Sequence, residues 1–187
     1  MKRLVIMTVG KTHSGKTTFA RALEKELTNS IVMDQDNQAE FINTYYKNLQ
    51  LKNGPNTLKH AISRLLVDYA IENTDSHLII CNSNRNRISR HNLLEELFYK
   101  NEFVRILVHF DIPDPVLLSR VAHSQRNTNI LRGASTFKEV LCRQQTESLS
   151  EDISDPIEGE VDYFFVIKNN DEVDSVIERI IEISRNS

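Results

Sequence analysis

Eight consecutive residues near the start of the chain have the types and spacing of a phosphate-binding loop. Gly10 to Thr17 read GKTHSGKT, which matches the Walker A pattern GxxxxGK[ST] at every fixed position. In such a loop the backbone N–H groups point inward around a chain of phosphates, and the glycines supply backbone angles that other residues rarely adopt. The sequence therefore predicts a site for ATP and Mg²⁺.

The chemistry of this loop assigns roles to single side chains. The ammonium of Lys16 reaches the β- and γ-phosphates and stabilises the transferring group, and the hydroxyl of Thr17 ligates Mg²⁺. The residues of the loop that we expect to contact the nucleotide are Gly10, His13, Ser14, Gly15, Lys16, Thr17 and Thr18. The competing interpretation is an ordinary glycine-containing turn that precedes a helix.

The flanking residues favour the phosphate-binding interpretation. The short apolar run at residues 4–7 is typical of a strand buried on both faces of a parallel sheet. After the loop, Phe19, Ala20, Leu23 and Leu27 fall on one face of a helix. Strand, loop and helix in this order are the context that the motif requires.

Strand and helix patterns alternate along the rest of the chain, which indicates an α/β protein with a mostly parallel sheet. Further strands are predicted at residues 31–33, 78–81, 104–110 and 164–167. The most regular helical stripe consists of Leu58, Ala61, Ile62, Leu65, Leu66, Tyr69 and Ala70, and we expect this face to be buried. A second stripe at residues 41–49 contains Tyr45 and Tyr46, for which we favour core packing over stacking on a base.

The composition sets limits on the function. The length of 187 residues fits one domain, residues 1–187, and the net charge of −3 argues against binding along extended nucleic acid. No apolar run approaches the length of a membrane span, and the isolated Cys81 and Cys142 suit a reducing compartment, so we expect a cytoplasmic protein. An NKxD guanine signature is absent, which disfavours regulatory GTPases, and motor or AAA+ ATPases need a longer chain.

Four blocks of the sequence carry a resemblance to a known family. They are KRLVIMTVGKTHSGKTTFAR at residues 2–21, residues 32–36, residues 78–86, and residues 110–113 with Leu117, Arg120 and Arg126. Over residues 3–145 the chain resembles the small P-loop kinases related to bacteriophage polynucleotide 5′-kinase and zeta-toxin-type kinases, and more loosely nucleoside and nucleotide kinases. The resemblance implies a three-layer α/β/α fold with a five-stranded parallel sheet in the order 2-3-1-4-5. It also implies transfer of the γ-phosphoryl group of ATP to a small-molecule acceptor, such as a nucleoside, a nucleotide or a 5′-hydroxyl end.

The resemblance places the catalytic base directly after the second strand. Asp36 matches by position, and Asp34 is its competitor. A carboxylate there accepts the proton of the acceptor hydroxyl as its oxygen attacks phosphorus. The structural alternative is that Asp36 or Asn37 caps the next helix, with Glu40 completing a capping box.

The polar segment at residues 123–135 resembles the lid of small kinases. A lid excludes water and brings arginines to the developing charge. By the family match Arg126 is the phosphate clamp and Arg120 is the next candidate for nucleotide contact, with Arg132 behind them. The alternative is an ordinary exposed loop.

Two features after the third strand leave the function open. Asn82 stands where the family often has an acidic residue, which favours as a rival function a nucleotide-binding regulatory protein with little or no transfer activity. The basic cluster of Arg85, Arg87, Arg90 and His91 either binds an anionic acceptor or forms a solvated helix start.

Overall fold

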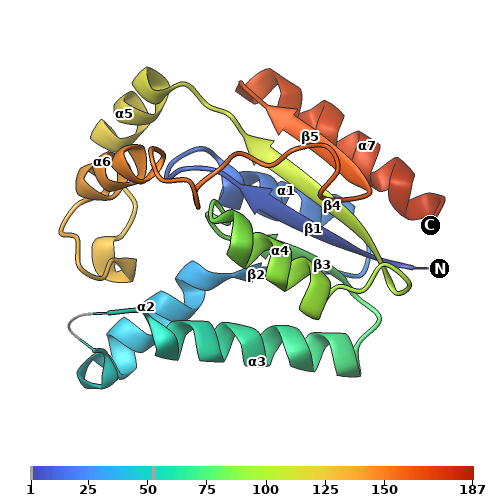
Figure 1. Cartoon of the computed structure of the whole chain (residues 1–187), viewed down its shortest axis with the longest axis horizontal. Coiled ribbons are helices and arrows are strands. Elements are labelled where there is room, and N and C mark those ends of the chain that lie inside the picture. Colours follow the sequence, from blue (N-terminus) through green and yellow to red (C-terminus); the bar gives the residue numbers. More distant parts are fainter. Residues whose placement is uncertain (1, 52–53) are drawn as a thin grey trace.

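The computed structural model describes residues 2–51 and 54–187 and contains a five-stranded sheet in the order β2-β3-β1-β4-β5 (Figure 1). All four neighbouring pairs are parallel. The strands are β1 (Arg3–Val9), β2 (Ser30–Asp34), β3 (His77–Cys81), β4 (Phe103–Phe110) and β5 (Tyr163–Ile167). The predicted fold class and strand order are confirmed.

Helices connect the strands and cover both faces of the sheet (Figure 1). The α-helices are α1 (Lys16–Glu26), α2 (Gln35–Tyr45), α3 (Thr57–Asn73), α4 (Arg87–Glu96), α5 (Asp114–Ala122), α6 (Phe137–Glu147) and α7 (Val173–Arg185). Short 3₁₀ turns are η1 (Lys47–Leu49), η2 (Thr128–Ile130) and η3 (Asn170–Glu172). None of the described helices is long and apolar enough to cross a membrane.

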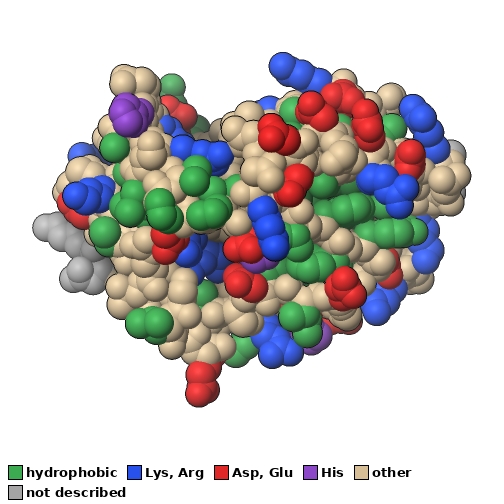
Figure 2. Space-filling view, turned by 90° about the horizontal axis from the view of Figure 1, so that it is seen from above, with side chains coloured by type: hydrophobic (Ala, Val, Ile, Leu, Met, Phe, Trp, Pro, Cys, Tyr) green, Lys and Arg blue, Asp and Glu red, His purple; other side chains and the backbone are tan. Residues whose placement is uncertain are grey.

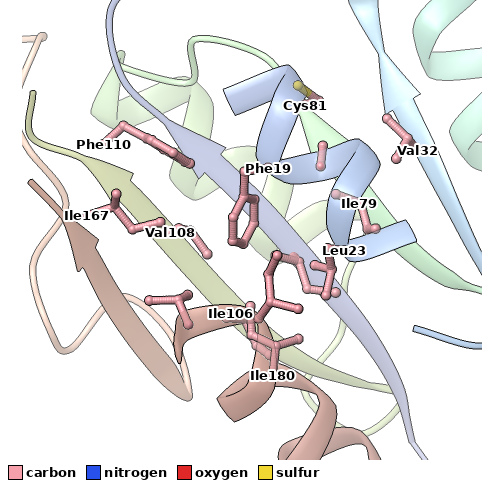
Figure 3. Packing of buried hydrophobic residues seen from close by; sticks show 14 of the residues in the cluster. Phe19, Leu23, Val32, Ile79, Cys81, Ile106, Val108, Phe110, Ile167 and Ile180 are labelled. Carbon is pink, nitrogen blue, oxygen red and sulfur yellow. The ribbon is translucent and has the colours of Figure 1, made fainter. Parts of the chain in front are cut away.

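The core consists of two apolar layers, one on each face of the sheet. Because side chains alternate along a strand, Leu4 and Ile6 of β1 pack on the side of α1 and α7, whereas Val5 and Met7 pack on the side of α3 and α4. In the first layer Phe19 of α1 packs between strands β1 and β4 and helix α7 (Figure 3). This double burial explains the continuous apolar run of β1, and it holds the loop that follows β1 on a rigid support.

The helix α3 is confirmed, but the expectation that its whole apolar stripe is buried is wrong. Ser63, Val67 and Ala70 face the interior, while Leu65 and Tyr69 are exposed. The buried row shares only Ala70 with the stripe, because α3 turns the side that carries Ser63 and Val67, rather than the stripe, toward the interior.

The expectation of core packing for the two tyrosines of the second stripe is also wrong. In α2 only Ala39 and Ile42 are buried, whereas Tyr45 and Tyr46 are exposed and pack at a tilt against the ring of Phe41. The end of α2 extends past the edge strand β2, so the sheet does not cover these tyrosines (Figure 1).

Candidate functional site

The loop between β1 and α1 is fixed by two glycines. A Cβ atom on Gly10 would lie 2.9 Å from Ser14 Oγ and 3.0 Å from Phe110 Cβ, so only glycine fits this close approach. Gly15 has φ +103° and precedes the first residue of α1. The Gly10 N–H donates to the Ser83 carbonyl at 3.0 Å, which ties the start of the loop to the segment after β3.

The side chain of Lys16 lies within this loop. Its ammonium donates to the Lys11 carbonyl and, at 3.1 Å, to the Ser14 hydroxyl. Burial lowers the pKa of Lys16 to about 8. The loop thus holds a desolvated cation, which favours an anionic ligand such as a phosphate chain.

Thr17 lies at the carboxyl ends of β2 and β3. Its hydroxyl donates to Asp34 Oδ2 at 3.3 Å and is 3.6 Å from Cys81 Sγ. The other carboxylate oxygen of Asp34 accepts from the Asp36 N–H at 3.0 Å, so Asp34 caps α2. Burial raises the pKa of Asp34. The structural alternative, in which Asp36 or Asn37 caps this helix, is therefore wrong, since Asp34 at the end of β2 takes this role.

With the cap supplied by Asp34, the side chain of Asp36 is available at the surface of the site. Its carboxylate forms an ion pair with Arg126 from residues 123–135, and both side chains are partly exposed. The guanidinium of Arg126 also lies 5.4 Å from the centre of the Phe137 ring. The structure thus brings together the two residues that the sequence predicted as base and phosphate clamp.

Arg120 and His13 connect the loop to the segment at residues 123–135. Arg120 donates to the His13 carbonyl at 3.1 Å and to Asn170 Oδ1 at 2.8 Å. The His13 ring is 2.8 Å from the Ser124 hydroxyl and packs edgewise on Phe137. Burial, followed by the charges of the surrounding cations, lowers the pKa of His13. At neutral pH His13 therefore serves as an uncharged spacer between the loop and this segment.

The far end of the same segment rests on α2. The Asn129 amide donates to Thr44 Oγ1 at 3.1 Å, and Asn43 donates to the Asn129 carbonyl. Arg132 donates to the carbonyls of Leu51 and Gly54. The segment therefore bridges the phosphate-binding loop and α2.

A cavity of about 900 Å³ lies between these elements. In the space-filling view, Lys and Arg side chains lie in a hollow of the surface (Figure 2). The predicted site residues that line the cavity are His13, Ser14, Gly15, Lys16, Thr17, Thr18, Asp36, Arg120 and Arg126. Gly10 does not line it, but borders a smaller neighbouring cavity of about 190 Å³. Asp34, Asn82 and Lys59 of α3 also line the large cavity, and of these only Lys59 was missed by sequence reasoning.

No motif could have indicated Lys59. It is one of 23 basic residues and stands alone within a helical stripe of apolar residues. Only the packing of α3 beside α2 brings it to the cavity.

Asn82 forms no hydrogen bond with Thr17, whose hydroxyl is directed to Asp34 and Cys81. The Asn82 amide donates to Gln35 Oε1 at 2.9 Å, at the start of α2. The acidic group beside Thr17 is instead Asp34. The acidic residue that the family pattern often has at position 82 is therefore absent, and the carboxylate near Thr17 comes instead from the neighbouring strand β2.

The basic cluster after β3 does not reach the cavity. Arg90 is buried and forms two bonds to the Glu160 carboxylate, at 2.7 and 2.9 Å. Arg85 donates to the Gln144 carbonyl at 2.8 Å and to the Ser148 hydroxyl. Arg85 and Arg90 therefore stabilise the fold where residues 148–160 fold back over the start of α4, whereas Arg87 and His91 are exposed on that helix.

Comparisons with known proteins agree with this geometry. The family AAA_33, described as an AAA domain, matches residues 5–151. No curated protein has a sequence that matches this chain. The sequence disfavoured AAA+ ATPases because the chain is short, yet the matching family carries the AAA name. The solved structures that are similar over nearly the whole chain are kinases.

Three solved structures share the fold along nearly the whole chain. APS kinase from Mycobacterium tuberculosis, in complex with AMPPNP and APS, has a TM-score of 0.62 and 16% identity, covering 98% of each chain. Shikimate kinase from Bacteroides thetaiotaomicron has a TM-score of 0.59 and 15% identity, covering 97% of this chain and 98% of that one. A gluconokinase from Sinorhizobium meliloti 1021 has a TM-score of 0.57 and 17% identity, covering 98% and 95%.

These identities establish a shared fold, and the family match covers well over half of the chain. The resemblance to small P-loop kinases is confirmed at this level. The chain belongs to the AAA_33 family and has the fold of the P-loop kinases.

Proposed function

We propose that this protein is a Mg²⁺-dependent kinase that transfers the γ-phosphoryl group of ATP to a small-molecule acceptor, such as a nucleoside, a nucleotide or a 5′-hydroxyl end. The observation that carries the proposal is one cavity lined both by the phosphate-binding loop, with Lys16 and Thr17, and by the pair Asp36 and Arg126. The similar APS kinase structure is a complex with both AMPPNP and APS, which supports binding of a nucleotide together with a second small molecule.

The residues present fit ATP and Mg²⁺. The loop presents backbone N–H groups and a partly buried ammonium, and the cavity of about 900 Å³ lies in the usual size range of a cofactor site. Among the described residues no group of three or more His, Cys, Asp or Glu side chains could hold a metal alone. Thr17 would therefore ligate Mg²⁺ together with the phosphates, and Asp34 beside it would orient a metal-bound water.

The remaining roles belong to the acceptor end of the cavity. Asp36 would accept the hydroxyl proton as the acceptor oxygen bonds to the γ-phosphorus and ADP leaves. Arg126 would leave its ion pair with Asp36 to spread its guanidinium over phosphate oxygens. Residues 123–135 would act as the lid that excludes water from the reaction.

A nucleotide-binding regulatory protein with little transfer activity is the second candidate. Two observations favour it. Position 82 carries an amide, hydrogen-bonded to Gln35, instead of a carboxylate, and the candidate base Asp36 is held in an ion pair with Arg126. In that case the cavity would bind nucleotide, and its occupancy would change the contacts of residues 123–135 with α2.

Incubation with radiolabelled ATP and Mg²⁺ and a panel of sugars, nucleosides, nucleotides and 5′-hydroxyl oligonucleotides tests the proposal. We expect a labelled product with at least one class, and product formation about 10²- to 10³-fold slower with Lys16→Ala. Clear binding of ATP–Mg²⁺ without a product from any acceptor would refute the kinase function and support the regulatory one.

A further inference from the structure

Lys59 is a cation at the acceptor end of the cavity that the proposed chemistry does not use. It lies in the first turn of α3 and lines the same cavity as Asp34 and Asp36. Its side chain is partly buried. The residue therefore faces the space that the acceptor would occupy, from a helix that carries none of the other assigned groups.

The ammonium of Lys59 has no hydrogen-bond or ion-pair partner among residues 2–51 and 54–187, in contrast to the neighbouring cations. Arg126 forms an ion pair with Asp36. Arg132 donates to the carbonyls of Leu51 and Gly54. Lys59 is thus the cation at this end of the cavity whose charge is not used within the described part of the fold.

The surroundings of Lys59 make an unpaired charge costly. Burial lowers the pKa of Lys59, and the charge of Arg132 acts in the same direction, whereas Asp36 and Asp34 oppose the shift. The two carboxylates are committed elsewhere, Asp34 to Thr17 and the cap of α2, and Asp36 to Arg126. A partly desolvated ammonium in this position is stabilised when a ligand supplies a negative group.

The start of α3 adds to the positive potential at this point. Asn56 precedes the helix without donating or accepting a side-chain cap bond, so the N–H groups of the first turn are not consumed by a side chain there. Such N–H groups and the positive end of a 17-residue helix favour an anion next to Lys59.

We propose that Lys59 binds an anionic group, a phosphate or a carboxylate, on the acceptor molecule whose hydroxyl Asp36 deprotonates. This inference rests on the proposed kinase function and names its substrate class. A lysine suits the task because its compact ammonium offers three donors to an anion without demanding a fixed planar geometry.

The test measures acceptor binding in the presence of a saturating non-hydrolysable ATP analogue and Mg²⁺, so that the phosphate-binding loop is occupied. Calorimetry compares matched pairs: sugar phosphates with free sugars, nucleoside monophosphates with nucleosides, and hydroxy acids with their amides. We expect the anionic member of at least one pair to bind, and the phosphate and carboxylate arms to identify which anion is used.

Three variants decide the role of Lys59. Lys59→Met should weaken binding of that anionic compound by about 10- to 100-fold, the range for a lost bond between charged groups. Lys59→Arg should retain most of the affinity. Lys47→Met, which removes an exposed lysine of η1 outside the cavity lining, should bind like the wild type.

Three outcomes would overturn the inference. They are equal affinity for the charged and neutral compounds of each pair, no binding of any anionic compound, and anion binding that Lys59→Met does not weaken. Transfer is assayed separately, which keeps this failure distinct from that of the kinase function. If the protein phosphorylates neutral acceptors and Lys59→Met does not change the rate, the kinase function holds and the anion site is refuted. If an anion binds in a manner that depends on Lys59 but no product forms, the anion site holds and the kinase function is refuted.

Discussion

The two ends of the cavity are built in different ways. The donor end is formed by one continuous segment, the loop from Gly10 to Thr17, whose residues 12–17 line the cavity between the buried part of β1 and helix α1. The acceptor end combines side chains from three distant segments, with Asp36 on α2, Lys59 on α3 and Arg126 from residues 123–135. A short motif therefore specifies phosphate binding locally, whereas acceptor recognition depends on tertiary packing.

The two ends also differ in how firmly they are held. At the donor end, Gly10 approaches backbone and side-chain atoms to 3 Å and the supporting strand has no exposed apolar residue. The acceptor end is joined by polar contacts between partly exposed groups, including the ion pair of Asp36 and Arg126. Such contacts open at low free-energy cost, so we expect motion during turnover to occur at the acceptor end.

We expect the largest effect on the transfer rate from a change at the acceptor end that leaves the donor end intact. Asp36→Asn should slow phosphoryl transfer by about 10²- to 10⁴-fold, the range for loss of a positioned proton acceptor, while ATP affinity stays nearly unchanged. Steady-state transfer and calorimetric titration of an ATP analogue provide the two readings. Glu40→Gln, an exposed neighbour on α2, is the matched control, and wild-type turnover in Asp36→Asn would remove Asp36 from the mechanism.

The variant Lys16→Ala tests the donor end of the cavity. Because Lys16 would contact the phosphates before and during transfer, the change should slow transfer by about 10²- to 10³-fold and also weaken nucleotide binding. The measurement is again kcat together with the dissociation constant of the analogue. A variant with intact nucleotide affinity would show that the loop binds phosphate by its backbone alone.

Arg126→Ala should have a smaller effect, spread over both ends. We expect about a 10- to 100-fold slower transfer, because loss of the guanidinium removes one of several donors to the phosphates. The free energy of unfolding should change little, since the ion pair with Asp36 is partly exposed. Arg179→Ala, which removes an exposed ion pair on α7, serves as control, and equal rates in the two variants would contradict the role of Arg126.

The smallest effect is a pH dependence at the donor end. Burial holds the pKa of Lys16 at about 8, and bound phosphates would raise it. Nucleotide binding between pH 8 and 9 should therefore take up a fraction of a proton, and affinity should fall by less than about tenfold per pH unit as pH rises. Titrations in buffers of different ionisation enthalpy measure this uptake, and binding without it would place the Lys16 charge away from the phosphates.

In the free protein the same shift acts on stability with the opposite sign. Between about pH 8 and the ordinary lysine pKa of 10.5, the unfolded chain binds more protons at position 16 than the folded chain does. The contribution of Lys16 to the free energy of unfolding therefore rises with pH across this window.

The sequence predicted most of the fold because its signals are local. The apolar run before Gly10 and the helical period after Lys16 define the first strand and helix, and alternating patterns define the other layers. The buried face of α3 could not be predicted, because the apolar stripe lies on another side of the helix and only Ala70 of its seven residues is buried. The positions of α2 and β2 decide which side of α3 faces the interior.

The site could be predicted only as far as its motifs reach. Asp36 and Arg126 are separated by 90 residues, yet the family resemblance named both and the fold brings them into contact. Lys59 carries no local signal, and the cluster containing Arg90 looked functional until Glu160, 70 residues away, was seen to bind it. Charged residues acquire a role from their partners, and those partners are set by the tertiary structure.

The most direct test of independent donor and acceptor ends is the affinity of a non-hydrolysable ATP analogue for the double variant Asp36→Asn with Lys59→Met. Independent ends predict an affinity within about twofold of the wild type, since neither Asp36 nor Lys59 is assigned a contact with the nucleotide. Lys16→Ala should be clearly weaker in the same titration. A double variant that loses as much affinity as Lys16→Ala would contradict the division of the cavity into a donor end and an acceptor end.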